Sequence, residues 1–267
     1  MTTIFKGTAL VTGASTGIGA VYADRLARRG YNLILVARNR ERLNALATRL
    51  NDESSITVQI EVADLGKRED VRRIENVLRT DASITMLVNN AGVGAVAPLL
   101  QADIDKMGDM IDLNVNALTR LTYAAVPRFV QRGGGTVINI ASIVGIRPEL
   151  LNGVYGATKA YVLALSQSLV SELADKNIRV QAVCPGATAT EFWPIAGNPV
   201  ENFPPEIVMT AENLVDAALA GLDQGEFVTI PSLPDSGVWE TYEAARQTLT
   251  LENLSRSAPA QRYQGTA

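Results

Sequence analysis

The sequence predicts an α/β fold in which a mostly parallel sheet is covered by helices on both faces. Short apolar runs alternate along the chain with longer amphipathic stretches, which is the pattern of strands joined by crossover helices. Most of the runs are apolar at nearly every position, as strands buried on both faces are. With 267 residues, 47% of them apolar, the chain can bury one large core. We therefore expect a single doubly wound domain over residues 1–267.

The predicted elements follow one another as strand and helix along the chain. Runs of apolar and β-branched residues predict strands at 8–12, 33–36, 56–62, 84–88, 136–140, 179–184 and 227–230. Apolar residues three or four positions apart predict helices at 20–29, 40–50, 67–79, 104–129, 155–173, 213–222 and 238–249. Gly30 ends the first helix, where glycine is common. The helix over 104–129 is predicted as one continuous element with Asn114 in its middle.

Residues 188–210 interrupt this alternation with four prolines and a glycine. A loop of this length in a compact domain is commonly functional or disordered, and we expect it to be a substrate lid. Its aromatic residues are Phe192, Trp193 and Phe203, and its charges are Glu191, Glu201 and Glu206. An apolar, acidic lid favours a small neutral or apolar substrate over an anionic one. The polar tail over 255–267 is expected to be loose.

The composition excludes several classes of function. The net charge is −4 and no basic run occurs, so we expect no nucleic-acid or anionic-membrane partner. No run of apolar residues is long enough to span a bilayer, and the first strand begins too early to leave room for a signal peptide. The single cysteine, Cys184, excludes an internal disulfide and fits the cytoplasm. The sequence has no histidine, so we expect no metal site and a general base of another type.

The sequence T-G-A-S-T-G-I-G at residues 12–19 joins the first strand to the first helix. Backbone N–H groups at such a turn and helix N-terminus can hold a phosphate. Gly13 permits the tight turn, Gly17 lets a pyrophosphate approach the backbone, and Gly19 allows close helix packing. The alternative is a tight connection without a ligand. We expect a dinucleotide to bind at Gly13, Ser15, Thr16, Gly17, Ile18 and Gly19.

The end of the second strand indicates which dinucleotide binds. Sites that prefer NAD place an acidic residue there, whereas an arginine suits the 2′-phosphate of NADP. This chain has Ala37 and Arg38, which favours NADP over NAD, although Arg38 could also be an ordinary surface residue. Asp64, after the third strand, could accept a hydrogen bond from adenine or cap the helix that begins near Lys67.

Three further residues have the chemistry to act on a carbonyl. Tyr155 and Lys159 stand one turn apart on a predicted helix, and Ser142 follows a buried strand. A phenol normally loses its proton near pH ~10, and an adjacent ammonium favours the phenolate. A hydroxyl, a phenol and a cation can together polarise and protonate a carbonyl oxygen. The alternative is a surface pair beside an unrelated serine.

Two asparagine residues could belong to the site, and the cysteine could be structural or reactive. Residues 89–92 (N-N-A-G) end the fourth strand, so Asn90 could face the glycine turn or belong to a plain turn. Asn114 could cap or kink its helix, or its amide could hold a water for proton relay. Cys184 lies in an apolar strand and is expected to be a buried structural thiol.

Together these residues resemble the short-chain dehydrogenase/reductase family over roughly residues 5–190. The matching motifs, in the family's order, are T-G-x-x-x-G-I-G at 12–19, N-N-A-G at 89–92, Asn114, Ser142, Y-x-x-x-K at Tyr155 and Lys159, and P-G at Pro185 and Gly186. The resemblance implies a Rossmann-type domain with a seven-stranded sheet. It also implies that the chain is an enzyme that uses a nicotinamide cofactor.

The resemblance implies roles for these residues. Tyr155 would be the catalytic acid/base and Ser142 would hydrogen-bond the substrate oxygen. Lys159 would bind the nicotinamide ribose and lower the pKa of Tyr155, while Asn114 would support a water relay. Further cofactor contacts would come from Asn90 at the nicotinamide ribose, from Thr188 at the carboxamide or pyrophosphate, and from Tyr155, Lys159, Pro185 and Gly186.

The predicted function is hydride transfer between NADP(H) and a carbonyl or secondary alcohol, as in the carbonyl and 3-oxoacyl reductases that the chain resembles. Many members have a Gly-Gly segment used in tetramer packing where this chain has FVTIPSLPDSGVWE at 227–240. We therefore expect a homodimer through the two long helices, with a tetramer as the alternative. One alternative is a catalytically silent protein of the same fold that senses NADP or acts as a scaffold. Another, a nucleotide-sugar epimerase or dehydratase, needs a larger C-terminal domain.

Overall fold

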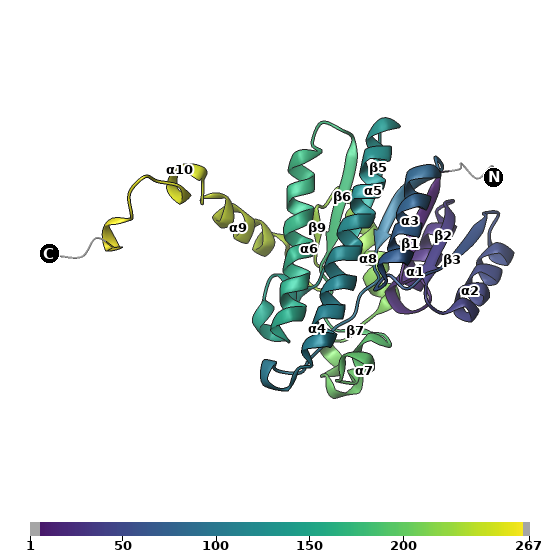
Figure 1. Cartoon of the computed structure of the whole chain (residues 1–267), viewed down its shortest axis with the longest axis horizontal. Helices are drawn as coiled ribbons and strands as arrows, with labels where there is room; N and C mark the ends of the chain where they lie inside the picture. The colour runs from purple at the N-terminus through teal and green to yellow at the C-terminus, as the bar shows by residue number, and fades with distance from the viewer. Residues whose placement is uncertain (1–5, 264–267) are drawn as a thin grey trace. The chain divides into compact units, whose positions relative to one another are not determined.

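A seven-stranded parallel sheet forms the centre of the computed structural model, which describes residues 6–263 (Figure 1). The strand order is β3-β2-β1-β4-β5-β6-β9, and every neighbouring pair is parallel. The strands are β1 (Thr8–Thr12), β2 (Asn32–Ala37), β3 (Val58–Val62), β4 (Ile84–Asn89), β5 (Gly135–Ile140), β6 (Ile178–Val183) and β9 (Val228–Thr229). The predicted α/β fold is confirmed.

Helices cover both faces of the sheet, and each face has its own apolar core. One core is built from α1 (Gly17–Arg28), α2 (Arg40–Glu53) and α8 (Ala211–Gln224), packed on the central strands. The other is built from α3 (Arg68–Thr80) and α5 (Leu118–Gln131). In Figure 1, α6 (Gly153–Glu172) lies on the same side as α3 and α5. This is the layered arrangement that right-handed crossovers produce.

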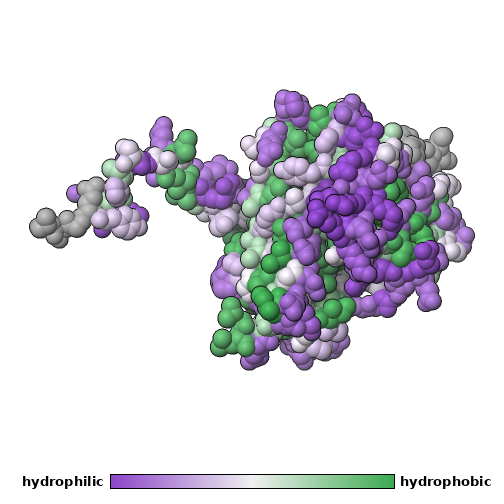
Figure 2. Space-filling model, viewed as in Figure 1, coloured by the Kyte–Doolittle hydropathy of each residue, from purple (hydrophilic) through white to green (hydrophobic). Residues whose placement is uncertain are grey.

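The predicted helix over 104–129 is interrupted in its middle. It consists of α4 (Ile104–Ile111), a π-helical segment (Asp112–Ala117) and α5. Asn114 lies in the π-helical segment, where each turn accommodates one additional residue. Leu99 and Leu100, ahead of α4, and Ile104, its first residue, are exposed apolar side chains. Figure 2 shows apolar residues at the surface along the lower edge of the view.

The segment 188–210, which we predicted as a loop, contains short regular elements. They are β7 (Thr188–Ala189), α7 (Phe192–Ala196) and β8 (Met209–Thr210), and β7 pairs with β8 as a separate parallel ladder. Gly197, with φ of +97°, ends α7 in the left-handed conformation. Both ends of the segment are therefore joined through β7 and β8 before the chain enters α8.

The described chain divides into two compact units at Pro231. The whole sheet lies in the first unit. The second unit begins at Ser232 and contains α9 (Ser236–Gln247), close to the helix predicted at 238–249, and the short α10 (Leu251–Leu254). Residues 264–267 of the predicted loose tail lie outside the described residues. No helix among residues 6–263 is long and apolar enough to cross a membrane.

Candidate active site

A cavity of about 720 Å³ opens at the carboxyl ends of the strands. β1 lies between β2 and β4, so the chain crosses over in opposite directions on either side of it, and open α/β sheets bind ligands at such a point. Of the residues predicted for the site, these line the cavity: Gly13, Ser15, Thr16, Gly17, Ile18, Arg38, Asp64, Asn90, Ser142, Tyr155, Lys159, Pro185, Gly186 and Thr188. Gly19 and Asn114 do not line it.

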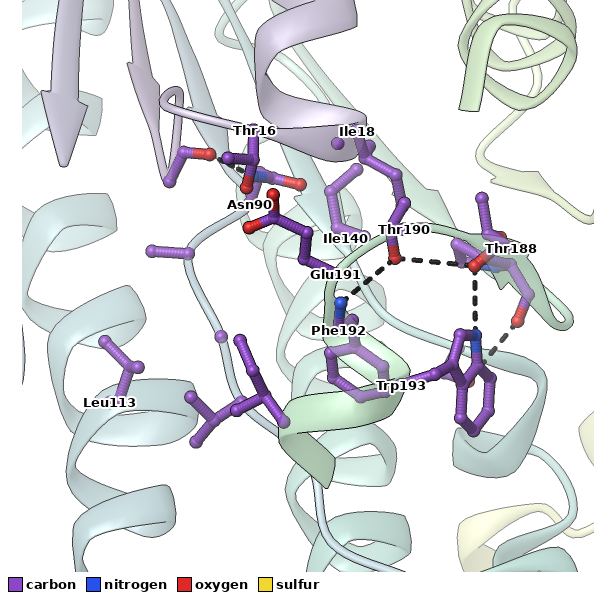
Figure 3. Close-up of a pocket in the computed structure, with 18 of the residues that line it drawn as sticks. Thr16, Ile18, Asn90, Leu113, Ile140, Thr188, Thr190, Glu191, Phe192 and Trp193 are labelled. Carbon is purple, nitrogen blue, oxygen red and sulfur yellow. Dashed lines mark hydrogen bonds between the residues drawn. The ribbon is translucent and has the colours of Figure 1, made fainter. Parts of the chain in front are cut away.

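The glycine-rich turn between β1 and α1 forms part of the cavity wall (Figure 3). Gly13 and Gly17 have φ of +65° and +53°, a conformation that favours glycine. A Cβ on Gly13 would lie 2.8 Å from the Asn90 amide nitrogen, so glycine is also needed for space. The N-cap residue of α1, Thr16, makes no side-chain capping bond. The first N–H groups of α1 therefore receive no acceptor from the cap and can bind a phosphate.

Asn90 ties the end of β4 to this turn. Its amide donates to the carbonyl oxygens of Thr12, at 2.9 Å, and Gly13, at 3.2 Å. Thr12 Oγ1 in turn accepts from the backbone N–H groups of Asn90 and Ala91, both at 3.0 Å. A Cβ on Gly19 would collide with the Gly13 carbonyl oxygen and lie 2.5 Å from the Asn90 amide nitrogen. Gly19 thus packs closely against the turn. Thr12, the first residue of the motif, supports the turn through its hydroxyl, a role that our sequence analysis did not assign.

The residues beside the turn fit the adenosine end of a dinucleotide. Arg38 is exposed on the cavity wall and makes no hydrogen bond or ion pair within residues 6–263, so its guanidinium is available for a phosphate. Asp64 Oδ1 accepts from the Gly66 N–H at 3.1 Å. The N-cap of α3 is Lys67, so the proposed capping role of Asp64 is wrong, because three residues separate it from the helix. The adenine contact stays a prediction.

Ser142, Tyr155 and Lys159 converge from β5 and α6. Their exposed fractions are 8%, 6% and 7%. Ser142 Oγ donates to the Pro185 carbonyl oxygen and accepts from the Val144 N–H, both at 3.3 Å. Lys159 Nζ donates to the Ile140 carbonyl oxygen at 2.8 Å and lies 5.9 Å from the centroid of the Tyr155 ring. A hydroxyl, a phenol and an amine therefore face one cavity.

The first turn of α6 fixes the tyrosine. Asn152 is the N-cap residue, and its Oδ1 accepts from the N–H groups of Val154, at 2.9 Å, and Tyr155, at 3.2 Å. The buried Asn152 amide also donates to the Ala97 carbonyl oxygen. Our sequence reasoning missed Asn152, although an asparagine just before an apolar helix is a recognisable capping signal.

Burial governs the protonation of this group. It raises the pKa of Tyr155 to about 12, against the opposing effect of the Ser142 hydrogen bond. It lowers the pKa of Lys159 to about 8, with only the Cys184 thiol acting in the other direction. The expected lowering of the tyrosine pKa by Lys159 is therefore absent in the protein alone, because desolvation penalises both charged forms. Burial likewise raises the pKa of Cys184 to about 12, which agrees with an unreactive structural thiol.

Asn114 lies behind the cavity wall and binds the backbone that forms it. Its amide donates to the Val93 carbonyl oxygen at 2.8 Å and to Thr158 Oγ1 at 3.1 Å, and its Oδ1 accepts from the Val93 N–H at 2.9 Å. Thr158 also donates to the Tyr155 carbonyl oxygen at 2.8 Å. Asn114 thus lies at an irregularity of its helix, as one of our alternatives proposed. Its hydrogen bond to Thr158 connects this π-helical segment to α6. The water relay stays a prediction.

The segment after β6 forms part of the cavity wall, and its own hydrogen bonds and ring contacts hold it together. Thr188 is buried, and its hydroxyl donates to the Gly186 carbonyl oxygen at 3.2 Å. The Trp193 indole N–H donates to the Thr188 carbonyl oxygen at 3.0 Å (Figure 3). Phe192, Trp193 and Phe203 form a continuous aromatic cluster, with centroids 5.3 Å and 4.5 Å apart.

Comparison with known proteins agrees with this geometry. The family model for short chain dehydrogenases matches residues 7–197. An uncharacterised oxidoreductase of Staphylococcus epidermidis is 32% identical over 86% of this chain and 96% of its own. A short-chain dehydrogenase from Sphingobium yanoikuyae, solved in complex with NADPH, is 49% identical with a TM-score of 0.93, over 96% of this chain and 99% of its own.

A further solved structure is the bulky-bulky ketone specific alcohol dehydrogenase from Comamonas testosteroni. It is 44% identical with a TM-score of 0.90, and the match covers 98% of this chain and all of that one (100%). The family model spans more than half of the chain, and it covers six of the seven strands of the sheet, the glycine turn, and Ser142, Tyr155 and Lys159. The chain therefore belongs to the short-chain dehydrogenase family of oxidoreductases.

Proposed function

We propose that this protein is an NADP(H)-dependent reductase of bulky, neutral, apolar ketones and, in reverse, a dehydrogenase of the corresponding secondary alcohols. The observation that carries the proposal is the convergence of Ser142, Tyr155 and Lys159 on a cavity whose wall also contains the glycine turn and Arg38. A phosphate cradle, a free guanidinium and a buried phenol in one cavity suit a nicotinamide dinucleotide and a carbonyl substrate.

The proposed chemistry assigns a role to each buried group. In reduction, the Tyr155 phenol gives its proton to the carbonyl oxygen, and the Ser142 hydroxyl donates a hydrogen bond to the same oxygen. A pKa raised to about 12 keeps Tyr155 protonated at neutral pH, as a proton donor must be. A bound nicotinamide would supply the hydride in reduction and accept it in oxidation. Lys159 would hold the nicotinamide ribose, and its charged form would stabilise the phenolate.

The supporting hydrogen bonds keep this group in position. Asn152 fixes the start of α6 at Tyr155, and the Ile140 carbonyl oxygen fixes the Lys159 amine. Asn114 holds Val93 and Thr158, so the loop that lines the cavity moves with α6. We expect these supports to restrict the reacting groups to a narrow range of positions, on which the rate of proton transfer depends.

Two observations support NADP(H) over NAD(H). Arg38 lies on the cavity wall after β2, and it has no acidic partner in the described part of the chain. A guanidinium binds a phosphate through a planar fork of donors, and the 2′-phosphate is the group that distinguishes the two cofactors. In addition, the similar dehydrogenase from Sphingobium yanoikuyae was solved with NADPH.

The substrate class follows from the apolar part of the cavity. The lining residues that belong to one apolar cluster with Tyr155 are Val93, Ile143, Val144, Leu151 and Phe192. Further apolar lining comes from Leu150, Trp193, Ile195, Phe203 and Ile207. Such a lining favours large apolar groups on the substrate and gives an anion no counter-charge. The Comamonas testosteroni relative acts on bulky-bulky ketones, which supports the same class here.

A ketone panel tests the proposal. NADPH oxidation would be followed with ketones that carry two large apolar groups, with one large and one small group, and with a charged group. We expect the highest kcat/KM for the neutral ketones with large groups, and lower values with NADH. A protein that binds NADPH but reduces none of the carbonyls would instead be the catalytically silent member of the fold.

We further propose a homodimer formed through α5 and α6. Tyr123 on α5 and Tyr161 and Val170 on α6 are apolar or aromatic residues exposed to solvent. Exposed residues of this kind on adjacent helices are typical of a subunit interface. Light scattering coupled to size-exclusion chromatography should give twice the mass of the chain, and Tyr123→Glu should lower it to that of a monomer.

A further inference from the structure

Consecutive residues of the 188–210 segment contact both the phosphate cradle and α2. Thr190 lies on the glycine turn, since a Cβ on Gly17 would come within 3.0 Å of its Cγ2. Glu191 Oε2 accepts a 2.7 Å hydrogen bond from Arg42 Nη1, across 149 residues of sequence. Figure 3 shows Glu191 extending toward the side of the cavity that carries Thr16. The ion pair therefore connects the segment to the cofactor end of the cavity.

The next residue of the segment contacts the catalytic tyrosine. The Phe192 ring packs on Tyr155 with centroids 5.7 Å apart and fills the space above Gly94. Its backbone N–H donates to Thr190 Oγ1 at 3.4 Å, and the neighbouring Trp193 is anchored to the Thr188 carbonyl oxygen. Phe192 thus occupies space beside the phenol that a bulky substrate must share.

Arg42 stands where the proposed 2′-phosphate would bind. Arg38, Asn39 and Arg42 all line the cavity, and Asn39 caps α2 by accepting from the Arg42 N–H at 3.0 Å. The two guanidinium groups differ in one respect. Arg38 makes no ion pair among the described residues, whereas the charge of Arg42 is neutralised by Glu191.

We propose that Glu191 is a positioning residue that couples the 2′-phosphate site to the space beside Tyr155. This inference rests on the proposed use of NADP(H). A 2′-phosphate competes with Glu191 for Arg42, because a phosphate and a carboxylate bind the same donors of a guanidinium. When the phosphate takes Arg42, the carboxylate is released, residues 190–193 lose their connection to α2, and Phe192 becomes free to move off Tyr155. The cofactor would thereby make room for the bulky ketone.

The strength of the ion pair suits such a competition. Both side chains are about half exposed, at 48% and 58%, so the pair is weak enough to be broken by a ligand. Pairs of this kind alter equilibria by about two- to fivefold, which sets the size of the expected effect. A dianionic phosphate that contacts both Arg38 and Arg42 has enough attraction to displace one carboxylate.

The experiment measures binding and tryptophan emission without turnover. The chain has two tryptophans, so Trp239→Phe leaves Trp193 as the single reporter, next to Phe192. The probes are adenosine 2′,5′-bisphosphate, which carries the 2′-phosphate, and adenosine 5′-monophosphate, which lacks it. Glu191→Gln removes the ion pair. Glu201→Gln is the matched control, because Glu201 lies in the same segment and makes no ion pair within residues 6–263.

We expect the bisphosphate, and not the monophosphate, to shift Trp193 emission in the Trp239→Phe protein. Glu191→Gln should already show part of this shift without ligand and bind the bisphosphate about two- to fivefold more tightly, while its affinity for the monophosphate stays the same. Glu201→Gln should behave like its parent. Equal bisphosphate affinity and emission in parent and Glu191→Gln would overturn the coupling and leave the cofactor preference intact. Equal binding of the two probes by the parent protein would overturn the NADP preference and the coupling with it.

Discussion

The Lys159 amine donates a 2.8 Å hydrogen bond to the carbonyl oxygen of Ile140, the last residue of β5. It lies 5.9 Å from the centroid of the Tyr155 ring, and no carboxylate pairs with it in the described part of the chain. A buried ammonium with one main-chain acceptor is poorly solvated, which explains why its pKa falls to about 8. The buried position of this amine therefore lowers the stability of the fold while the amine is charged.

Lys159→Met should stabilise the fold at neutral pH. The pKa of Lys159 falls from 10.5 to about 8 on burial, so between these values the unfolded chain holds more protons than the folded one. The unfolding free energy contributed by this residue therefore rises with pH over that window. We expect Lys159→Met to raise the unfolding free energy by up to about 3 kcal/mol near pH 7, and the gain to vanish near pH 10.5.

Urea unfolding across this pH range would measure the effect. Lys106→Met is the control, because Lys106 is exposed on α4 and should change stability little at any pH. A Lys159→Met variant that is destabilised at neutral pH would show that the amine is better solvated than its burial indicates.

Arg38→Asp should change the choice of cofactor. The substitution replaces a free guanidinium on the cavity wall with a carboxylate that repels a 2′-phosphate and can accept from a 2′-hydroxyl. Loss of a charge-assisted bond predicts about a 10- to 100-fold weaker affinity for NADPH, with NADH affinity unchanged or improved. Titration of protein fluorescence with each cofactor measures both values. Arg40→Asp is the control, because Arg40 is the first residue of α2 and does not line the cavity, and it should leave the cofactor preference unchanged. An unchanged preference in Arg38→Asp would contradict our assignment of Arg38 to the 2′-phosphate.

Gly19→Ala should disturb the glycine turn. An added Cβ would collide with the Gly13 carbonyl oxygen and lie 2.5 Å from the Asn90 amide, so the turn must shift. Overpacking of this kind costs about 1–3 kcal/mol, and the shift should also weaken cofactor binding. Gly108→Ala on α4 meets no atom within 4 Å and should instead stabilise the protein by about 0.5–1 kcal/mol. Thermal unfolding would measure the change in stability of each variant. Equal changes in the two variants would contradict the close packing at Gly19.

The sequence patterns that predicted the sheet were strong because its inner strands are buried on both faces, whereas the edge strand β3 is only half-buried. β1 and β2 are apolar almost throughout, and their burial leaves little ambiguity about their place in the core. The glycine turn and the Tyr155–Lys159 pair could likewise be predicted from the sequence, because the residues of each lie close together in the chain and a turn or a helix fixes their spacing. Local patterns of this kind need no knowledge of distant residues.

What the sequence could not predict depends on contacts between distant segments. The π-helical segment at Asn114 is connected to the Val93 backbone, 21 residues away, and apolar periodicity carries no sign of that bond. The Arg42–Glu191 pair joins residues 149 positions apart. The two-residue strand β7 is too short to show a period, and prolines dominate the segment that follows it. The pKa of Tyr155 was misjudged for a similar reason, since its burial comes from the whole fold.

Tyr155→Phe tests the central claim most directly, because it removes one oxygen atom and keeps the ring that packs on Phe192. The measurement pairs ketone-dependent NADPH oxidation with NADPH binding by the same variant. We expect kcat to fall by at least about 100-fold, the scale of general acid catalysis, with the Kd for NADPH nearly unchanged. Turnover at the wild-type rate by a variant that binds NADPH normally would show that another group protonates the substrate.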